Sequence, residues 1–139
     1  MAFKPAENQF VLRKRINFKD AAFVVVPIPY EKTTSYGQGT KYGPSAVIDA
    51  SYQIELWDEE TKEETWKKGI FTTQPVNCAL TENRFFPSLE RTVEKLLSST
   101  KALPFFVGGE HSVTQGLLPP FIKRHKDLSI LHFDAHADL

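Results

Sequence analysis

The sequence predicts an α/β fold with a mainly parallel sheet. Two short apolar runs, residues 21–30 and 102–111, have the length and continuity of buried strands, and residues 128–136 form a third such run. Between the first two, residues 83–101 repeat apolar side chains at helical spacing. Strands that alternate with helices are typical of a parallel sheet covered by helices, so we expect an α/β domain.

The N-terminal residues 1–20 hold five basic and two acidic side chains and no apolar run. We expect a polar arm that packs late or frays, followed by a single domain over residues 21–139. Valine-rich residues 21–30 stop at two prolines and predict the first strand. A glycine-rich loop, residues 33–44, then precedes a helix that begins at Pro44 and continues through residues 45–55.

An acidic segment follows this helix, and Trp57 and Trp66 stand at its two ends. We expect an exposed hairpin whose two tryptophans pair across it. Residues 83–101 predict an amphipathic crossover helix. Residues 112–126 predict a helix that is broken near Pro119 and Pro120, because proline lacks the N–H that a helix interior needs.

Composition excludes several classes of protein. The chain has 139 residues, is 41% hydrophobic and carries 17 basic and 17 acidic side chains, so it has enough apolar residues for a core and no net attraction to nucleic acid or anionic lipid. A single cysteine cannot form an internal disulfide and suits a reducing compartment. No apolar run reaches the roughly 18 residues that span a bilayer. We expect a cytoplasmic protein that binds neither nucleic acid nor membranes.

Histidines and acidic residues gather where two of the expected strands end. His111 follows residues 102–110, whereas Asp134, His136 and Asp138 recur at every second position. Strand alternation puts these three side chains on one side, and the carboxyl ends of parallel strands are where open α/β sheets bind ligands. Full extension would separate Asp134 from Asp138 by roughly 13 Å, so we expect the chain to turn after His136.

These side chains predict a divalent metal site. Imidazole and carboxylate ligands without thiolate suit an ion such as Mn²⁺ and argue against a structural cysteine-type zinc site. Two histidines and two aspartates also form a plausible half of a two-metal site, with Asp134 as a candidate bridge. The alternative is that these residues only cap strands and make loop hydrogen bonds, but their joint occurrence at two strand ends favours the metal.

Other polar residues of the two motifs are expected to support the site. His132 shares the parity of Asp134 but precedes it, so we expect it behind the ligands or in the core rather than on the metal. Glu110 is adjacent to His111, and neighbouring strand residues face opposite sides, so we expect a supporting or structural role and not a general base. Ser112 is expected to cap the next helix, and Cys78 to be buried and inert.

Three motifs together resemble the ureohydrolase family, which includes arginase, agmatinase and formimidoylglutamase. They are PIPYEKTTSYGQGTKYGP over residues 27–44, GGEHS over residues 108–112 and DAHAD over residues 134–138. The resemblance covers the chain from about residue 21 to its end, and the glycine-rich loop is most similar to the agmatinase branch. It implies a three-layer α/β/α arginase-like fold, of which this chain is the N-terminal part, cut after the strand that carries DAHAD.

The resemblance also implies the chemistry. Members of the family hold two Mn²⁺ ions per complete active site, and by motif His111 ligates one ion, His136 the other, Asp134 both, and Asp138 completes the first. The two ions hold a bridging hydroxide that attacks a guanidinium carbon and releases urea and an amine. We expect hydrolysis of a small cationic guanidino substrate, agmatine to putrescine, by a homo-oligomer when the chain is full length.

Two alternatives stay open. The first is another ureohydrolase activity, as in arginase, guanidinobutyrase or formimidoylglutamase. The second is a non-catalytic truncated fragment or partner subunit that keeps the sheet and half of the site. The family's Asp-x-Asp segment, which supplies the other two of six ligands, is absent from this sequence. We therefore expect the 139-residue chain alone to bind manganese weakly and not to turn over, and no proton-transfer residue is assigned.

Overall fold

The computed structural model describes residues 3–11 and 15–136, which form a three-stranded parallel sheet. β1 (Phe23–Ile28) is the central strand, with β2 (Ile70–Thr72) on one side and β3 (Leu103–Gly108) on the other. Both neighbours run parallel to β1. The expected α/β class and the parallel sheet are therefore confirmed.

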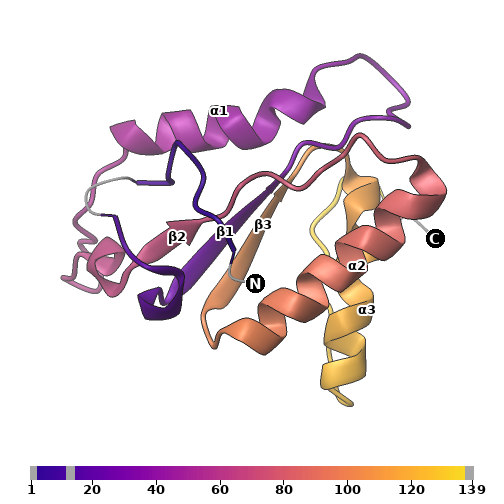
Figure 1. Cartoon of the computed structure of the whole chain (residues 1–139). Coiled ribbons are helices and arrows are strands. Elements are labelled where there is room, and N and C mark those ends of the chain that lie inside the picture. Colours follow the sequence, from indigo (N-terminus) through magenta and orange to yellow (C-terminus); the bar gives the residue numbers. More distant parts are fainter. Residues whose placement is uncertain (1–2, 12–14, 137–139) are drawn as a thin grey trace.

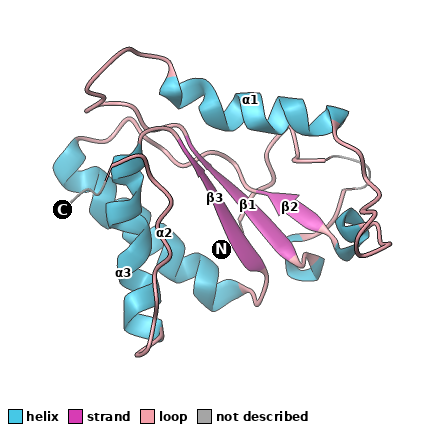
Figure 2. Ribbon diagram, turned by 180° about the vertical axis from the view of Figure 1, so that it is seen from behind, coloured by secondary structure: helices cyan, strands magenta, loops and turns pink. Residues whose placement is uncertain are grey.

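Helices lie on both faces of this sheet (Figure 1). α1 (Gly43–Ala50) crosses one face, whereas α2 (Glu82–Ser99) and α3 (Thr114–Arg124) lie side by side on the other, and the view from behind shows the same layers (Figure 2). This is the expected three-layer arrangement. Short 3-10 helices complete the described chain at Phe18–Asp20, Thr40–Tyr42, Ser51–Gln53, Thr65–Lys68 and His111–Val113. No helix within the described ranges is long and apolar enough to cross a membrane.

The core lies between β1 and α2. Strand alternation gives β1 one inward row, Val24, Val26 and Ile28, and these side chains are buried. The facing side of α2 presents four buried side chains three or four residues apart: Phe85, Leu89, Val93 and Leu96. Beyond β1, the buried Tyr30 ring stacks on Phe85 with centroids 4.0 Å apart. This packing anchors the strand ends from which the candidate site is built.

The N-terminal segment lies along the outer edge of β2 in its described part. Pro5 forms a bridge with Thr73, and the buried side-chain amide of Gln9 accepts a hydrogen bond from the Thr72 N–H and donates one to the Thr72 carbonyl. Phe18 packs into the core against Phe71. The described part of the expected arm thus covers a strand edge and satisfies polar groups that the edge would otherwise expose.

The expected break near Pro119 and Pro120 is wrong, because α3 continues through both prolines. Each proline removes one helical hydrogen bond. Gly116, one turn before Pro120, is buried so closely against α2 that an added Cβ would lie 3.0 Å from the Leu89 side chain. This close packing against α2 stabilises α3 and offsets the lost bonds.

The expected third strand at residues 128–136 is also wrong, because the described part of this segment is an exposed loop. Ile130, Leu131 and Phe133 are more than half exposed. A strand needs a neighbour for its N–H and C=O groups, and among the described residues no strand pairs with the outer edge of β3. An apolar run without such a neighbour does not form a strand.

β3 differs from expectation in its burial. The sequence suggested a buried strand, yet Leu103 and Phe105 are 56% and 50% exposed. These two side chains lie on the sheet face opposite the row that packs against α2. Phe105 borders a shallow apolar groove there, together with Phe23 and Ile70. β2 was not among the expected strands, because its three residues are too few to form a recognisable pattern.

The acidic segment turns as expected but without the expected aromatic pair. Asp58 and Glu63 form an antiparallel bridge, and the Asp58 carboxylate accepts hydrogen bonds from the N–H groups of Glu60 and Thr61. Trp66 lies in the following 3-10 helix, and its indole N–H donates to Glu64.

Candidate metal centre

The site begins where β3 ends, at a glycine pair. The Gly109 N–H donates to the Ile28 carbonyl, and the Glu110 N–H donates to the Tyr30 carbonyl, so the chain follows β1 closely past the strand end. A Cβ on Gly109 would lie 2.1 Å from the Tyr30 oxygen, which no side chain permits. The glycine therefore lets the backbone approach β1 closely before the chain enters the His111–Val113 turn.

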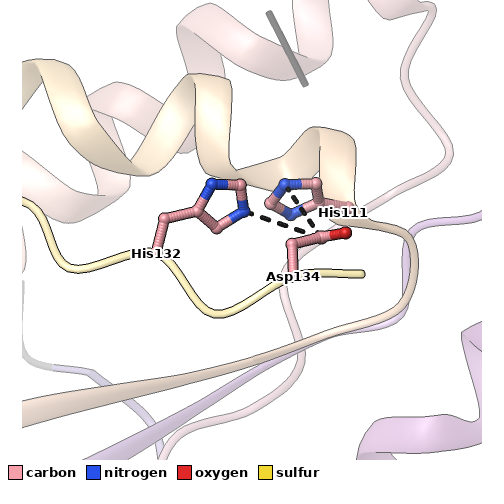
Figure 3. A group of neighbouring side chains, drawn as sticks. All are labelled: His111, His132 and Asp134. Carbon is pink, nitrogen blue, oxygen red and sulfur yellow. Dashed lines mark ion pairs between the residues drawn. The ribbon is translucent and has the colours of Figure 1, made fainter. Parts of the chain in front are cut away.

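Three potential ligands converge beside this turn (Figure 3). Oδ2 of Asp134 lies 3.8 Å from Nε2 of His111 and 3.6 Å from Nε2 of His132. The two imidazole rings stack with centroids 5.3 Å apart, and the three donor atoms all lie within 4.8 Å of one another. The structure thus joins the end of β3 to the loop that follows α3.

Asp134 also contacts His136 with its second oxygen. Oδ1 accepts a hydrogen bond from the His136 N–H at 2.8 Å and lies 3.4 Å from Nδ1 of the His136 ring. The His136 N–H lowers the pKa of the Asp134 carboxyl, partial burial opposes this, and the three nearby imidazoles lower it further. Asp134 is therefore a carboxylate at neutral pH. Its Oδ2 faces His111 and His132, and its Oδ1 faces His136.

The structure brings together most of the residues that the sequence singled out. His111, Asp134 and His136 are neighbours through Asp134, and Asp138 lies outside the described residues. His132 was expected behind the ligands. Its ring instead stacks beside that of His111, and both rings face the same oxygen of Asp134. The sequence held a signal for this placement, because His132 and Asp134 are two residues apart and share a side of an extended chain.

Glu110 points away from this cluster and toward the glycine-rich loop. Its Oε2 accepts hydrogen bonds from the N–H groups of Lys32 and Thr33, and its Oε1 accepts them from the hydroxyls of Thr33 and Ser112. Partial burial raises the pKa of the Glu110 carboxyl, but the hydrogen bonds from Ser112, Thr33 and Lys32 outweigh it and lower the pKa to about 2. Ser112 therefore binds Glu110 in place of the expected helix cap.

A second carboxylate closes the glycine-rich loop itself. Glu31 accepts hydrogen bonds from the N–H groups of Gly39 and Lys41, while the Lys41 ammonium lies 3.8 Å from the same carboxylate. Gly37 and Gly39 have φ values of +70° and +123°, which favour glycine, and Tyr36 beside them is 97% exposed. The motif identified this loop, and the sequence suggested a supporting role for Glu110 but none for Glu31.

The donor set fits a divalent ion. Ligand atoms bound at about 2.1 Å from one ion lie roughly 3 to 4 Å apart, and the two measured histidine-to-aspartate distances fall in that range. Two imidazoles and a carboxylate suit borderline or hard divalent ions, Mn²⁺ among them. The Thr114 hydroxyl lies 3.4 Å from Nδ1 of His111, on the ring edge away from Asp134, a placement typical of groups that orient a ligating histidine.

Fold and site together define an α/β protein with a candidate metal centre at the carboxyl edge of its sheet. The chain belongs to the arginase family, whose sequence profile matches residues 21–139. The resemblance drawn from the three motifs is thereby confirmed.

Similar proteins agree with this assignment. The chain is 34% identical to the N(1)-aminopropylagmatine ureohydrolase of Synechocystis, across 99% of this chain and 47% of that protein. It is 28% identical to the agmatinase of Bacillus cereus, across 92% and 44%. The fold matches the proclavaminate amidino hydrolase of Streptomyces clavuligerus with a TM-score of 0.81 and 25% identity, across 96% and 45%. The chain thus spans just under half the length of these relatives.

Proposed function

We propose that this chain supplies the first metal-binding half of a manganese-dependent hydrolase that releases urea from a guanidino compound. The observation that carries the proposal is the convergence of His111, His132 and Asp134 at the carboxyl edge of the sheet. Membership of the arginase family supports the same reaction class. Because the chain spans under half of its relatives, the activity is proposed for the protein that contains it.

His111, His132 and Asp134 would hold one ion through the atoms that already face one another, and His136 would meet the second oxygen of Asp134. Manganese, when bound, lowers the pKa of water toward neutrality and so supplies a nucleophile at pH 7. Asp134 contributes a negative charge beside three imidazoles, which offsets part of the positive charge of an ion. This offset favours the approach of a cationic guanidino group.

The proposed substrate is agmatine, with N(1)-aminopropylagmatine as the second candidate. Agmatine is favoured by the likeness of the glycine-rich loop to the agmatinase branch and by the agmatinase of Bacillus cereus among the relatives. The higher identity to the aminopropylagmatine enzyme of Synechocystis favours the longer amine. Both are guanidino amines without a carboxylate, so the substrate class is the same in either case.

Assays of the natural gene product, purified with Mn²⁺, test this function. We expect urea release from agmatine or N(1)-aminopropylagmatine with a higher kcat/KM than from arginine, and no formamide release from formimidoylglutamate. Asp134→Ala should abolish turnover, whereas Asp127→Ala, an exposed carboxylate in the preceding loop, should leave it unchanged. No urea from any guanidino compound, or full activity in Asp134→Ala, would contradict the proposal.

A further inference from the structure

We propose that Glu110 is a positioning residue that joins residues 31–42, which contain most of the glycine-rich loop and are called the loop below, to the turn that carries His111. Its carboxylate is the contact between them, because Oε2 binds the backbone of the loop and Oε1 binds one hydroxyl from each side. The loop and the His111 turn therefore order together. The coupling itself does not depend on the proposed function, but its consequence for manganese does.

Each acceptor position of the carboxylate is used. Lys32 and Thr33 donate their N–H groups at 2.8 and 2.9 Å, and the hydroxyls of Thr33 and Ser112 donate at 2.5 and 2.6 Å. Hydrogen bonds to an ionised acceptor are roughly twice as strong as neutral ones. Four of them on one partly buried carboxylate fix the side chain in one orientation.

The backbone around Glu110 is fixed as well. Its N–H donates to the Tyr30 carbonyl, directly before the loop, and the next residue is His111. Ser112 lies in the same turn as His111, so its bond to Glu110 sets how that turn leaves β3. A shift of Thr33 would therefore reach His111 through only two side chains, Glu110 and Ser112.

Glu31 offers a matched comparison. It also accepts two backbone N–H bonds from the loop, those of Gly39 and Lys41, but these hydrogen bonds stay within the loop and do not reach the His111 turn. Its replacement should loosen the loop tip and leave the His111 turn unchanged. The two glutamates thus separate an effect of loop order from an effect transmitted to His111.

Amide hydrogen exchange and the NMR shifts of the His111 ring test the coupling in this chain. In Glu110→Gln, the amides of Lys32 and Thr33 should exchange roughly tenfold faster or more, the His111 ring signals should move, and the buried β1 amides should exchange as before. Glu31→Gln should affect only the amides of Gly39 and Lys41. Thr33→Val and Ser112→Ala each remove one donor and should move the His111 signals in the same direction as Glu110→Gln.

Three results would overturn the proposal. The first is unchanged amide exchange at Lys32 and Thr33 in Glu110→Gln. The second is an equal acceleration of exchange in β1, which would mean general destabilisation. The third is faster exchange in the loop while the His111 ring signals stay in place. A Mn²⁺ titration of the same variants addresses the proposed function separately. If the coupling holds and the wild-type chain binds manganese, Glu110→Gln should weaken binding several-fold, whereas Glu31→Gln should not. If the wild-type chain does not bind manganese, that result counts against the proposed function and not against the coupling.

Discussion

The Asp134 Oδ2 atom lies 3.8 Å from the His111 Nε2 atom, although His111 precedes α3 and Asp134 follows it. Asp134 stands in a loop, and His111 stands in the 3-10 turn that follows β3. α3 leads away from the carboxyl edge of the sheet, and the loop after it returns the chain to that edge, where parallel α/β proteins bind their ligands (Figure 1). This pair defines the candidate metal centre, and replacing either partner should reveal it.

Asp134→Asn should weaken Mn²⁺ binding by this chain by about tenfold or more. The substitution keeps the size of the side chain but removes the negative charge that faces His111 and His132. Free Mn²⁺, counted by its electron paramagnetic resonance signal during a titration, gives the affinity. Asp127→Asn serves as the control because that carboxylate is exposed and outside the cluster. Equal affinity in both variants would remove Asp134 from the site.

Gln9→Leu should destabilise the fold by about 1 to 3 kcal/mol. The buried Gln9 amide is the partner of the Thr72 N–H, and leucine would leave that donor without an acceptor at the edge of β2. Urea unfolding of wild type and variant measures the difference. Gln115→Leu, on the exposed side of α3, should change stability by less than about 0.5 kcal/mol. Similar values for the two variants would mean that the N-terminal segment does not cover the edge.

Gly109→Ala should destabilise the chain by about 3 kcal/mol, because its methyl group would overlap the Tyr30 carbonyl oxygen. Gly39→Ala is the matched substitution, since nothing lies within 4 Å of the added Cβ there. Its positive φ alone should cost about 1 to 2 kcal/mol. Thermal unfolding of both variants checks the order, and a milder effect at Gly109 would contradict the close approach to β1.

Cys78 should react slowly with thiol reagents in the folded chain. Burial raises the pKa of its thiol from 9.0 to about 11, and Lys32 opposes this only in part. At pH 8 the thiolate fraction is then roughly a hundredfold lower than in urea, where the same reagent should react quickly. Because the folded pKa is the higher one, the thiol adds stability below about pH 9 and loses that contribution as the pH rises to about 11. Equal rates in both states would contradict its burial.

Sequence patterns predicted the central elements well. The apolar run at residues 21–30 contains β1, and the spacing of Leu89, Val93 and Leu96 gives the buried side of α2, because both patterns reflect burial against neighbours that the described chain supplies. The run at residues 128–136 has a similar composition but no neighbouring strand among the described residues. Composition therefore measures the tendency to be buried, whereas a strand also depends on a partner.

For the candidate site, the motifs identified the residues and the structure supplied their grouping. His111 and Asp134 could be chosen from sequence because each follows an apolar run. The spacing of His132 and Asp134 was a local signal for the position of His132. The bonds of Glu110 to Lys32 and Thr33, in contrast, join segments far apart in sequence, so no local pattern predicted them.

Paramagnetic relaxation by Mn²⁺ tests the central claim most directly. The chain has four histidines, and their ring signals can be followed by NMR as Mn²⁺ is added. The account predicts that the signals of His111 and His132 broaden first and together, followed by His136, whereas His125 at the end of α3 stays sharp until far more metal is present. Broadening of His125 at the same metal concentration, or sharp signals from His111 and His132 throughout, would contradict a metal centre built on Asp134.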